Sequence, residues 1–269
     1  MTNKILFSGE KVLACIDGSS VSEYVCDYAA WIALTVDRQL KLLHTIEQNH
    51  GAAVSDYSGA IGLGSRQELL NELTQAENNR ARLLLKQGQI MLSAAKQRVK
   101  SFGVEKIESY QHRGSLAESL VELEQDIRFM VIGIRGNSHE SQAQNQGLGH
   151  QLESVIRSMH KPILVVNKAF SEPQSAMLAY DGSDSCKKAL AMIASSRLFK
   201  KLPCHIVHVG DHGEQLLSEA VSVLQEAGID TKSAQLEGSV VDALVNYQKQ
   251  NYIEITLMGA FSHNRFVIF

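Results

Sequence analysis

The chain has 269 residues, of which 44% are hydrophobic, and a formal net charge of −3. Its length suits one large domain or two ordinary ones, and its composition is that of a globular protein with a real core. The charge excludes a global electrostatic attraction to nucleic acid or to an anionic membrane. The first residues carry no leader-like apolar run, and no stretch approaches the roughly 18 apolar residues of a membrane span. The sequence therefore predicts a cytoplasmic protein that contacts neither nucleic acid nor a membrane.

The first predicted element is a buried strand at about 11–16 that ends in a turn. Its apolar residues run without alternation, as expected for a parallel strand covered on both faces. Asp17-Gly18-Ser19-Ser20 then provides turn residues and a helix cap, and a helical pattern follows at about 20–36. An Asp between a parallel strand and a helix lies where open α/β sheets bind ligands. The alternative is that Asp17 only caps the helix, and the two roles are compatible.

The rest of the first half alternates strands with helices. Strands are predicted at about 39–46, 104–110, 129–134 and 162–166, and helices at about 66–102, 115–124 and 147–159. This alternation predicts βαβ units in a parallel sheet with helices on both faces. The polar stretches between these elements read as loops.

The predicted helix at 66–102 is unusually long. Its apolar residues recur at spacings of three, four or seven, which predicts an amphipathic helix with one buried stripe. That stripe consists of Leu69, Leu73, Ala76, Leu83, Ile90 and Ala94.

The strand and turn that begin the chain occur a second time, at 176–183. Asp17 aligns with Asp181, and His44 aligns with His208, both at an offset of 164. Strands are predicted at 176–180, 204–209, 230–235 and 253–258, and helices at 185–199, 213–227 and 239–250. Such self-similarity predicts a duplicated fold.

The second copy is shorter than the first. After Gly259 only ten residues remain, so it lacks a counterpart of the last helix and strand. The predicted domains are residues 1–170 and 171–269. If the two copies pair through their last strands, the strand near 163–166 has lost its partner, and an exposed apolar edge is a liability. We expect Phe266-Val267-Ile268-Phe269 to cover this edge, or two chains to meet there.

Neither the cysteines nor the histidines indicate a metal site. The four cysteines are scattered without CxxC spacing, which favours reduced, buried thiols, and Cys15 is read as a core thiol rather than a redox sensor. His205, His208 and His212 invite a zinc hypothesis, but residues 205 and 208 point to opposite faces of the predicted strand. No Ser/His/Asp order, paired carboxylates or Walker-type lysine is recognisable, so no catalytic residue is assigned.

Several further motifs follow one another in a fixed order along the chain. They are Gly133-Ile134-Arg135-Gly136, Leu148-Gly149, Lys161-Pro162-Ile163-Leu164-Val165-Val166 and Gly259-Ala260-Phe261-Ser262-His263-Asn264-Arg265. Together with the two strand-Asp-Gly-Ser openings and the two aligned histidines, they make the chain resemble the universal stress protein family in its tandem-repeat form. The resemblance implies two Rossmann-like α/β units, each a five-stranded parallel sheet ordered 3-2-1-4-5. It also implies a homodimer, or a pseudo-dimer within the chain, through strand 5.

The resemblance further implies a ligand, because many members of this family bind ATP or another adenine nucleotide. Glycines let the backbone approach the phosphates, and amides at a helix N-terminus hold the anion. Carried onto the first repeat, the nucleotide-binding residues are Asp17, Thr45, Ile46, Gly133, Gly136, Gly149, His150 and Gln151. Mg²⁺ is a candidate companion of the nucleotide.

The chain departs from the family pattern in both repeats. The spacer from Gly136 to Gly149 is longer than the family's, and His150 stands where a Ser or Thr is usual. In the second repeat Ser262 replaces the second glycine and the rest of the phosphate loop is missing. The remnant consists of Asp181, Val209 and Gly259.

The function that follows is a stress-response binding module that is not an enzyme, with an adenine nucleotide as ligand. One alternative is a scaffold of the same family that binds no nucleotide and acts through protein contacts. A further alternative is a weak ATP hydrolase, for which Arg135 and His139 are the nearby cationic candidates.

Overall fold

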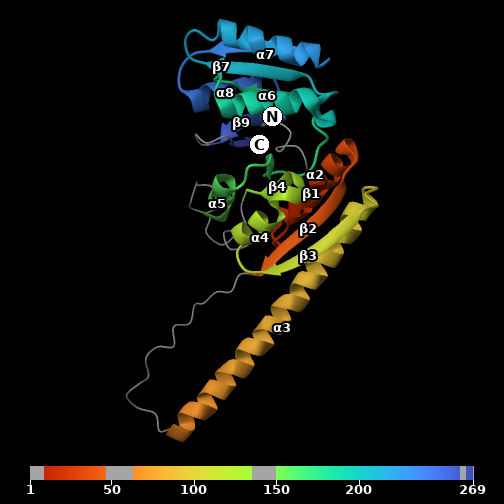
Figure 1. Cartoon of the computed structure of the whole chain (residues 1–269), viewed down its shortest axis with the longest axis vertical. Coiled ribbons are helices and arrows are strands. Elements are labelled where there is room, and N and C mark those ends of the chain that lie inside the picture. Colours follow the sequence, from red (N-terminus) through yellow and green to blue (C-terminus); the bar gives the residue numbers. More distant parts are fainter. Residues whose placement is uncertain (1–8, 47–62, 135–149, 261–264, 269) are drawn as a thin grey trace.

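The structure of the chain, a computed structural model, describes residues 9–46, 63–134, 150–260 and 265–268. Within these ranges the strands form a ten-stranded sheet in the order β3-β2-β1-β4-β5-β10-β9-β6-β7-β8. Figure 1 shows the two halves of the chain stacked along the longest axis, with the helix α3 projecting from the first half. The helices described include none that is both long and apolar enough to cross a membrane.

The first unit has the predicted strand order 3-2-1-4-5, and all of its pairs are parallel. Its strands are β1 (Lys11–Cys15), β2 (Gln39–Ile46), β3 (Ile107–Arg113), β4 (Ile127–Gly133) and β5 (Ile163–Val166). Its helices are α2 (Ser22–Val36), α3 (Leu63–Ser101), α4 (Leu116–Leu123), the short 3₁₀ helix η1 (Glu124–Asp126) and α5 (His150–Ser158). The third strand begins later than the predicted residue 104, because residues 102–106 form the connection after α3.

The sheet of the first unit is buried on both faces. Val12 and Ala14 pack on the side covered by α2 and the end of α3, whereas Leu13 belongs to a second cluster with α4 and α5. Successive residues of a strand point to opposite faces, so an uninterrupted apolar run is what a strand between two helical layers requires. The prediction from the run at 12–16 is confirmed.

The second unit has the order β9-β6-β7-β8, which repeats the arrangement β4-β1-β2-β3 of the first. Its strands are β6 (Ala176–Ala179), β7 (Cys204–Val209), β8 (Thr231–Leu236) and β9 (Ile255–Ala260). Its helices are α6 (Asp184–Ser195), the 3₁₀ helix η3 (Arg197–Phe199), α7 (Glu214–Glu226) and α8 (Val240–Gln250). The unit therefore has the predicted duplicated fold, and no counterpart of α5 follows β9 in the part described.

A short strand, β10 (Arg265–Ile268), joins the two units into one sheet. Val267 pairs with Ile163 of β5 in parallel and with Met258 of β9 in antiparallel orientation. The expectation that the C-terminal residues cover the edge of β5 is confirmed for Val267 and Ile268, while Phe269 lies outside the described residues. Because β10 runs antiparallel to β9, it is the return strand of a hairpin and not a copy of β5.

The long helix α3 is amphipathic, but the predicted buried stripe is wrong. Leu73, Leu83 and Ile90 are 46%, 68% and 62% exposed, and Leu69 lies among side chains outside the description. The residues that pack on the sheet are instead Leu92, Ala95 and Val99, which are at most 8% exposed. The helix is much longer than the sheet beside it, so only its last turns find a surface to cover.

Candidate functional site

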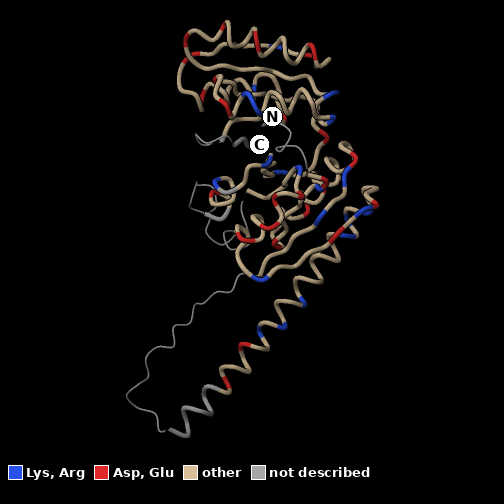
Figure 2. The backbone as a smooth tube through the Cα atoms, viewed as in Figure 1, with Lys and Arg blue, Asp and Glu red and all other residues tan. Residues whose placement is uncertain are grey.

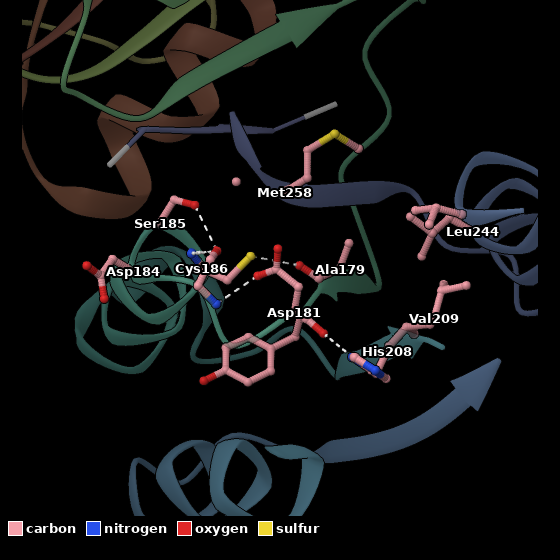
Figure 3. A pocket seen from close by; sticks show the side chains of 14 residues that line it. Ala179, Asp181, Asp184, Ser185, Cys186, His208, Val209, Leu244 and Met258 are labelled. Atoms are coloured by element: carbon pink, nitrogen blue, oxygen red, sulfur yellow. Dashed lines mark hydrogen bonds between the residues drawn. The ribbon is translucent and has the colours of Figure 1, made fainter. Parts of the chain in front are cut away.

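A cavity of about 520 Å³ lies at the carboxyl ends of β6, β7 and β9 in the second unit (Figure 3). The chain leaves β6 toward β7 on one side, while β9 flanks β6 on the other side. Crevices at such a reversal of strand order are where open α/β sheets hold ligands. Asp181, Val209 and Gly259, named from the sequence on three separate strands, all line this cavity.

Asp181 presents a carboxylate in the turn between β6 and α6. Its Oδ1 accepts a hydrogen bond of 2.8 Å from the backbone amide of Ser183, and the turn is possible because Gly182 has φ +76°. Partial burial opposes ionisation, but hydrogen bonds from Ser183 and Cys186 outweigh it and hold the pKa of Asp181 below its ordinary value. The carboxylate is therefore ionised at neutral pH.

A histidine ties the ends of the first two strands together in each unit. Nδ1 of His208 lies 2.9 Å from the carbonyl oxygen of Tyr180, and Nδ1 of His44 lies 3.0 Å from that of Ile16. A carbonyl only accepts, so Nδ1 is the donor in both pairs and Nε2 is left as the second ring nitrogen. The sequence offset of 164 between the histidines signalled this repeated contact, although neither residue was named as part of a site.

In the first unit the corresponding strand ends carry Asp17, Thr45, Ile46 and Gly133. Oδ1 of Asp17 accepts hydrogen bonds from the amide of Ser19 at 3.0 Å and from the hydroxyl of Ser22 at 2.9 Å. These bonds organise the turn before α2, so the capping alternative describes this carboxylate oxygen. They do not exclude a ligand at the same turn.

Most of the residues predicted to bind the phosphates in the first unit lie, entirely or with their side chains, outside the described part of the structure. Gly136 and Gly149 lie outside the described residues, as do Arg135 and His139. His150 and Gln151 form the start of α5, but only their backbone is described. The expectation that amides at this helix start hold a phosphate stays a prediction.

In the described part of the second unit, no helix covers the rim of the cavity as α5 covers α4 in the first unit. In the first unit Leu116 and Leu120 of α4 are 9% and 0% exposed and share a cluster with Leu152 and Ile156 of α5. The equivalent of Leu116 in α8 is Val240, which is 56% exposed and lines the cavity. No sequence signal in α8 itself pointed to this residue, since its exposure follows from the helix that the described part of this unit lacks.

The thiols near the crevices are not poised for chemistry. Burial, with the nearby Asp17 as a lesser cause, raises the pKa of Cys15 to about 12. Burial likewise raises the pKa of Cys186 above its ordinary value. The thiolate is the reactive form, so both residues behave as protonated core side chains at neutral pH. Among the described residues no three His, Cys, Asp or Glu side chains are arranged to hold a metal ion.

These features define a class of protein: a duplicated, doubly wound α/β fold whose candidate site lies at the switch point of its sheet. The sequence profile of the Universal stress protein family matches residues 9–167. The chain is 36% identical over 263 residues to Universal stress protein Slr1230 of Synechocystis sp., covering 95% of this chain and 91% of that protein. The chain belongs to the universal stress protein family.

Solved structures show the same fold at lower sequence identity. A universal stress protein from Archaeoglobus fulgidus DSM 4304 matches with a TM-score of 0.67 and 19% identity, covering 92% of this chain and 85% of that one. A functionally unknown protein from Pseudomonas aeruginosa PAO1 matches with a TM-score of 0.53 and 13% identity, covering 98% and 93%. At such identities the likeness speaks for the fold alone.

Proposed function

We propose that the chain is a non-enzymatic, stress-linked binding module of the cytoplasm whose ligand is an adenine nucleotide. The observation that carries the proposal is the cavity of about 520 Å³ at the switch point of the second unit. Its size falls within the range of about 300–1,000 Å³ that holds small ligands, and its position is where α/β folds bind nucleotides.

The lining of the cavity suits a nucleoside. The ionised carboxylate of Asp181 can accept hydrogen bonds from sugar hydroxyls, the chemistry by which dinucleotide-binding folds hold a ribose. Val207, Val209 and Leu244 provide apolar contacts for a base. Figure 3 shows Asp181 between Cys186 and His208, with Leu244 near Val209 on the side away from Cys186.

We propose different ligand preferences for the two units. The first unit would hold a complete nucleotide, with or without Mg²⁺, through Asp17, Thr45, Ile46, Gly133, Gly136, Gly149, His150 and Gln151. In the second unit Ser262 stands where the family pattern has its second glycine, so Asp181, Val209 and Gly259 would hold the nucleoside and leave the phosphates in solvent. Adenosine should therefore compete well with ATP in the second unit and poorly in the first.

Calorimetric titration of the full chain with ATP and Mg²⁺, and separately with adenosine, tests this proposal. Asp17→Ala and Asp181→Ala are a matched pair, because the two residues hold equivalent positions in the two units. We expect Asp181→Ala to abolish adenosine binding and Asp17→Ala to weaken ATP binding. No heat with either ligand in the wild-type protein would refute the nucleotide proposal.

A second pair of variants tests the location of the ligand by replacing apolar residues only. Val240 lines the cavity, whereas its neighbour Val241 is 70% exposed and does not. Val240→Trp should fill the cavity and weaken adenosine binding, and Val241→Trp should leave it unchanged. Equal effects of the two variants would place the nucleoside elsewhere.

The scaffold alternative is the second candidate function. It is favoured by the exposed apolar residues of α3, a surface that a pure nucleotide-binding protein does not require. An absence of nucleotide binding together with a defined protein partner would support it. Weak ATP hydrolysis would need Arg135 or His139, and turnover unchanged in a variant lacking both would remove that alternative.

A further inference from the structure

The projecting part of α3 carries apolar side chains that nothing in the described chain covers. Every residue from 71 to 84 is exposed, and Leu73, Leu83 and Ile90 are 46%, 68% and 62% exposed. Figure 1 shows this part of the helix extending away from the sheet. Large apolar side chains that are aligned along an exposed helix and rimmed by polar ones suit an interaction surface.

The spacing of these residues is that of a helix–helix seam. Positions 73, 76, 80, 83, 87 and 90 are separated alternately by three and four residues, the a/d repeat of a coiled coil. Leu73 and Leu83 supply the apolar knobs, and Ala76 is a small residue that leaves room for a long one opposite. From Leu73 to Leu83 the paired part of the seam is about 15 Å long at 1.5 Å per residue.

The charges along the same part of α3 are divided into two blocks. Glu72 and Glu77 lie toward the projecting end, and Arg80, Arg82 and Lys86 lie toward the sheet. Figure 2 shows this change from red to blue along the helix. Two such helices in parallel would place like charges side by side, whereas antiparallel helices place Glu72 of each beside the basic block of the other.

We propose that the seam of α3 binds the α3 seam of a second copy of this chain in antiparallel orientation. In the register that joins a to d positions, Leu73 packs on Leu83 of the partner subunit and Ala76 lies under Arg80 of the partner subunit. Glu72 then lies beside Lys86 of the partner subunit, and Glu77 lies near the two-fold axis. Two-fold symmetry forms each contact twice, which is the closed, isologous arrangement of most homodimers.

This interface is separate from the sheet edge through which the family resemblance implied a dimer. Both sides of β5 are paired within the chain, to β4 and to β10. The interface is also independent of the proposed nucleotide, because the seam residues lie on the projecting helix and none of them lines the second-unit cavity.

Sedimentation equilibrium of the full-length chain, over a range of concentrations, tests the seam. Leu83→Glu should raise the dimer dissociation constant at least about a hundredfold, because symmetry counts the lost apolar burial twice. The matched control is Val121→Glu, an equally exposed valine (68%) on α4 that should leave the dimer intact. A monomeric wild-type protein, or a dimer that survives Leu83→Glu, would overturn the proposal.

A charge exchange tests the orientation. Lys86→Glu should weaken the dimer, because it replaces an attractive ammonium with a carboxylate beside Glu72 of the partner subunit. The double variant Glu72→Lys/Lys86→Glu should restore the dimer. In a parallel pair each position faces its own equivalent, so the exchange would rescue nothing. Circular dichroism verifies that each variant keeps its helices, which is expected because both positions are exposed.

Discussion

At the scale of single residues, the two units repeat a small constellation: an Asp in the turn after the first strand and a His that fastens the end of the second. The hydrogen bonds of Asp17 and Asp181 to following serine amides show that each aspartate shapes its own turn. A turn-forming carboxylate can still face a ligand, and Asp181 does line a cavity. The capping and binding interpretations are therefore compatible in one residue.

An ion pair that anchors α3 to α2 provides a residue-scale prediction. Nε and Nη2 of Arg98 donate to the two carboxylate oxygens of Asp27 at 2.6 and 2.8 Å, and the side chain of Asp27 is 8% exposed. Arg98→Met leaves that carboxylate buried without its partner and should cost about 2–3 kcal/mol of unfolding free energy in urea. Arg157→Met, in an exposed helical pair with Glu153, should cost less than about 0.5 kcal/mol. Equal costs would contradict this account.

The lowered pKa of Asp181 predicts a pH dependence of stability. A carboxyl whose pKa is lower in the folded chain stabilises the fold above its unfolded value of about 3.9, and this contribution is lost as the pH falls through the folded pKa. Asp181→Asn should therefore be less stable than wild type at pH 7, and the gap should narrow below about pH 4. Urea unfolding at pH 7 and below about pH 4 measures this difference in unfolding free energy, and Asp211→Asn, at an exposed position, is the control. If the difference in unfolding free energy between the variant and wild type grew in acid, the explanation would be wrong.

At the scale of elements, equivalent helices differ in burial because only one of them has a covering helix in the described chain. Leu120 of α4 and Leu244 of α8 hold the same position in the two units, but Leu120 is fully buried whereas Leu244 is only partly buried. α5 covers α4, and nothing in the described chain does the same for α8.

This difference predicts unequal costs for the same substitution. Leu120→Ala should cost about 3–4 kcal/mol, because it removes a core side chain and leaves a cavity. Leu244→Ala should cost about half as much or less, since water already reaches its surroundings. Denaturant unfolding compares the two variants directly. Similar losses would mean that the face of α8 is covered in solution.

At the scale of the whole molecule, four residues decide whether the two units share one sheet. β10 pairs with both β5 and β9, and the strand it covers, Ile163–Val166, is buried along its entire length. Without β10 the edge of β5 would expose backbone donors and acceptors beside apolar side chains, which invites pairing with other chains.

Deleting residues 265–269 should therefore convert a protein with a defined assembly into one that aggregates or forms larger species. Light scattering coupled to gel filtration is the measurement. Val267→Pro should reproduce much of the effect because it removes an amide from a central strand, and Val267→Thr, which keeps the amide, should not. An unchanged elution profile of the deletion variant would show that β10 is dispensable.

The sequence by itself determined the features that depend on local pattern. Uninterrupted apolar runs identified buried parallel strands, the repeated Asp-Gly-Ser turns identified the strand ends, and the offset of 164 identified the duplication. These inferences hold because periodicity and turn chemistry are properties of neighbouring residues. The family and the strand order of the first unit followed from the same motifs.

The tertiary structure decided what depends on distant neighbours. The helix α3 has two apolar stripes, and only the position of the sheet selects Leu92, Ala95 and Val99 for burial and leaves Leu73 and Leu83 exposed. The exposure of the α8 face and the pairing of β10 with β5 likewise arise from contacts between residues far apart in the chain. Burial is a property of what packs against a side chain, so a pattern of spacing can propose a face of a helix but cannot say which face meets a partner.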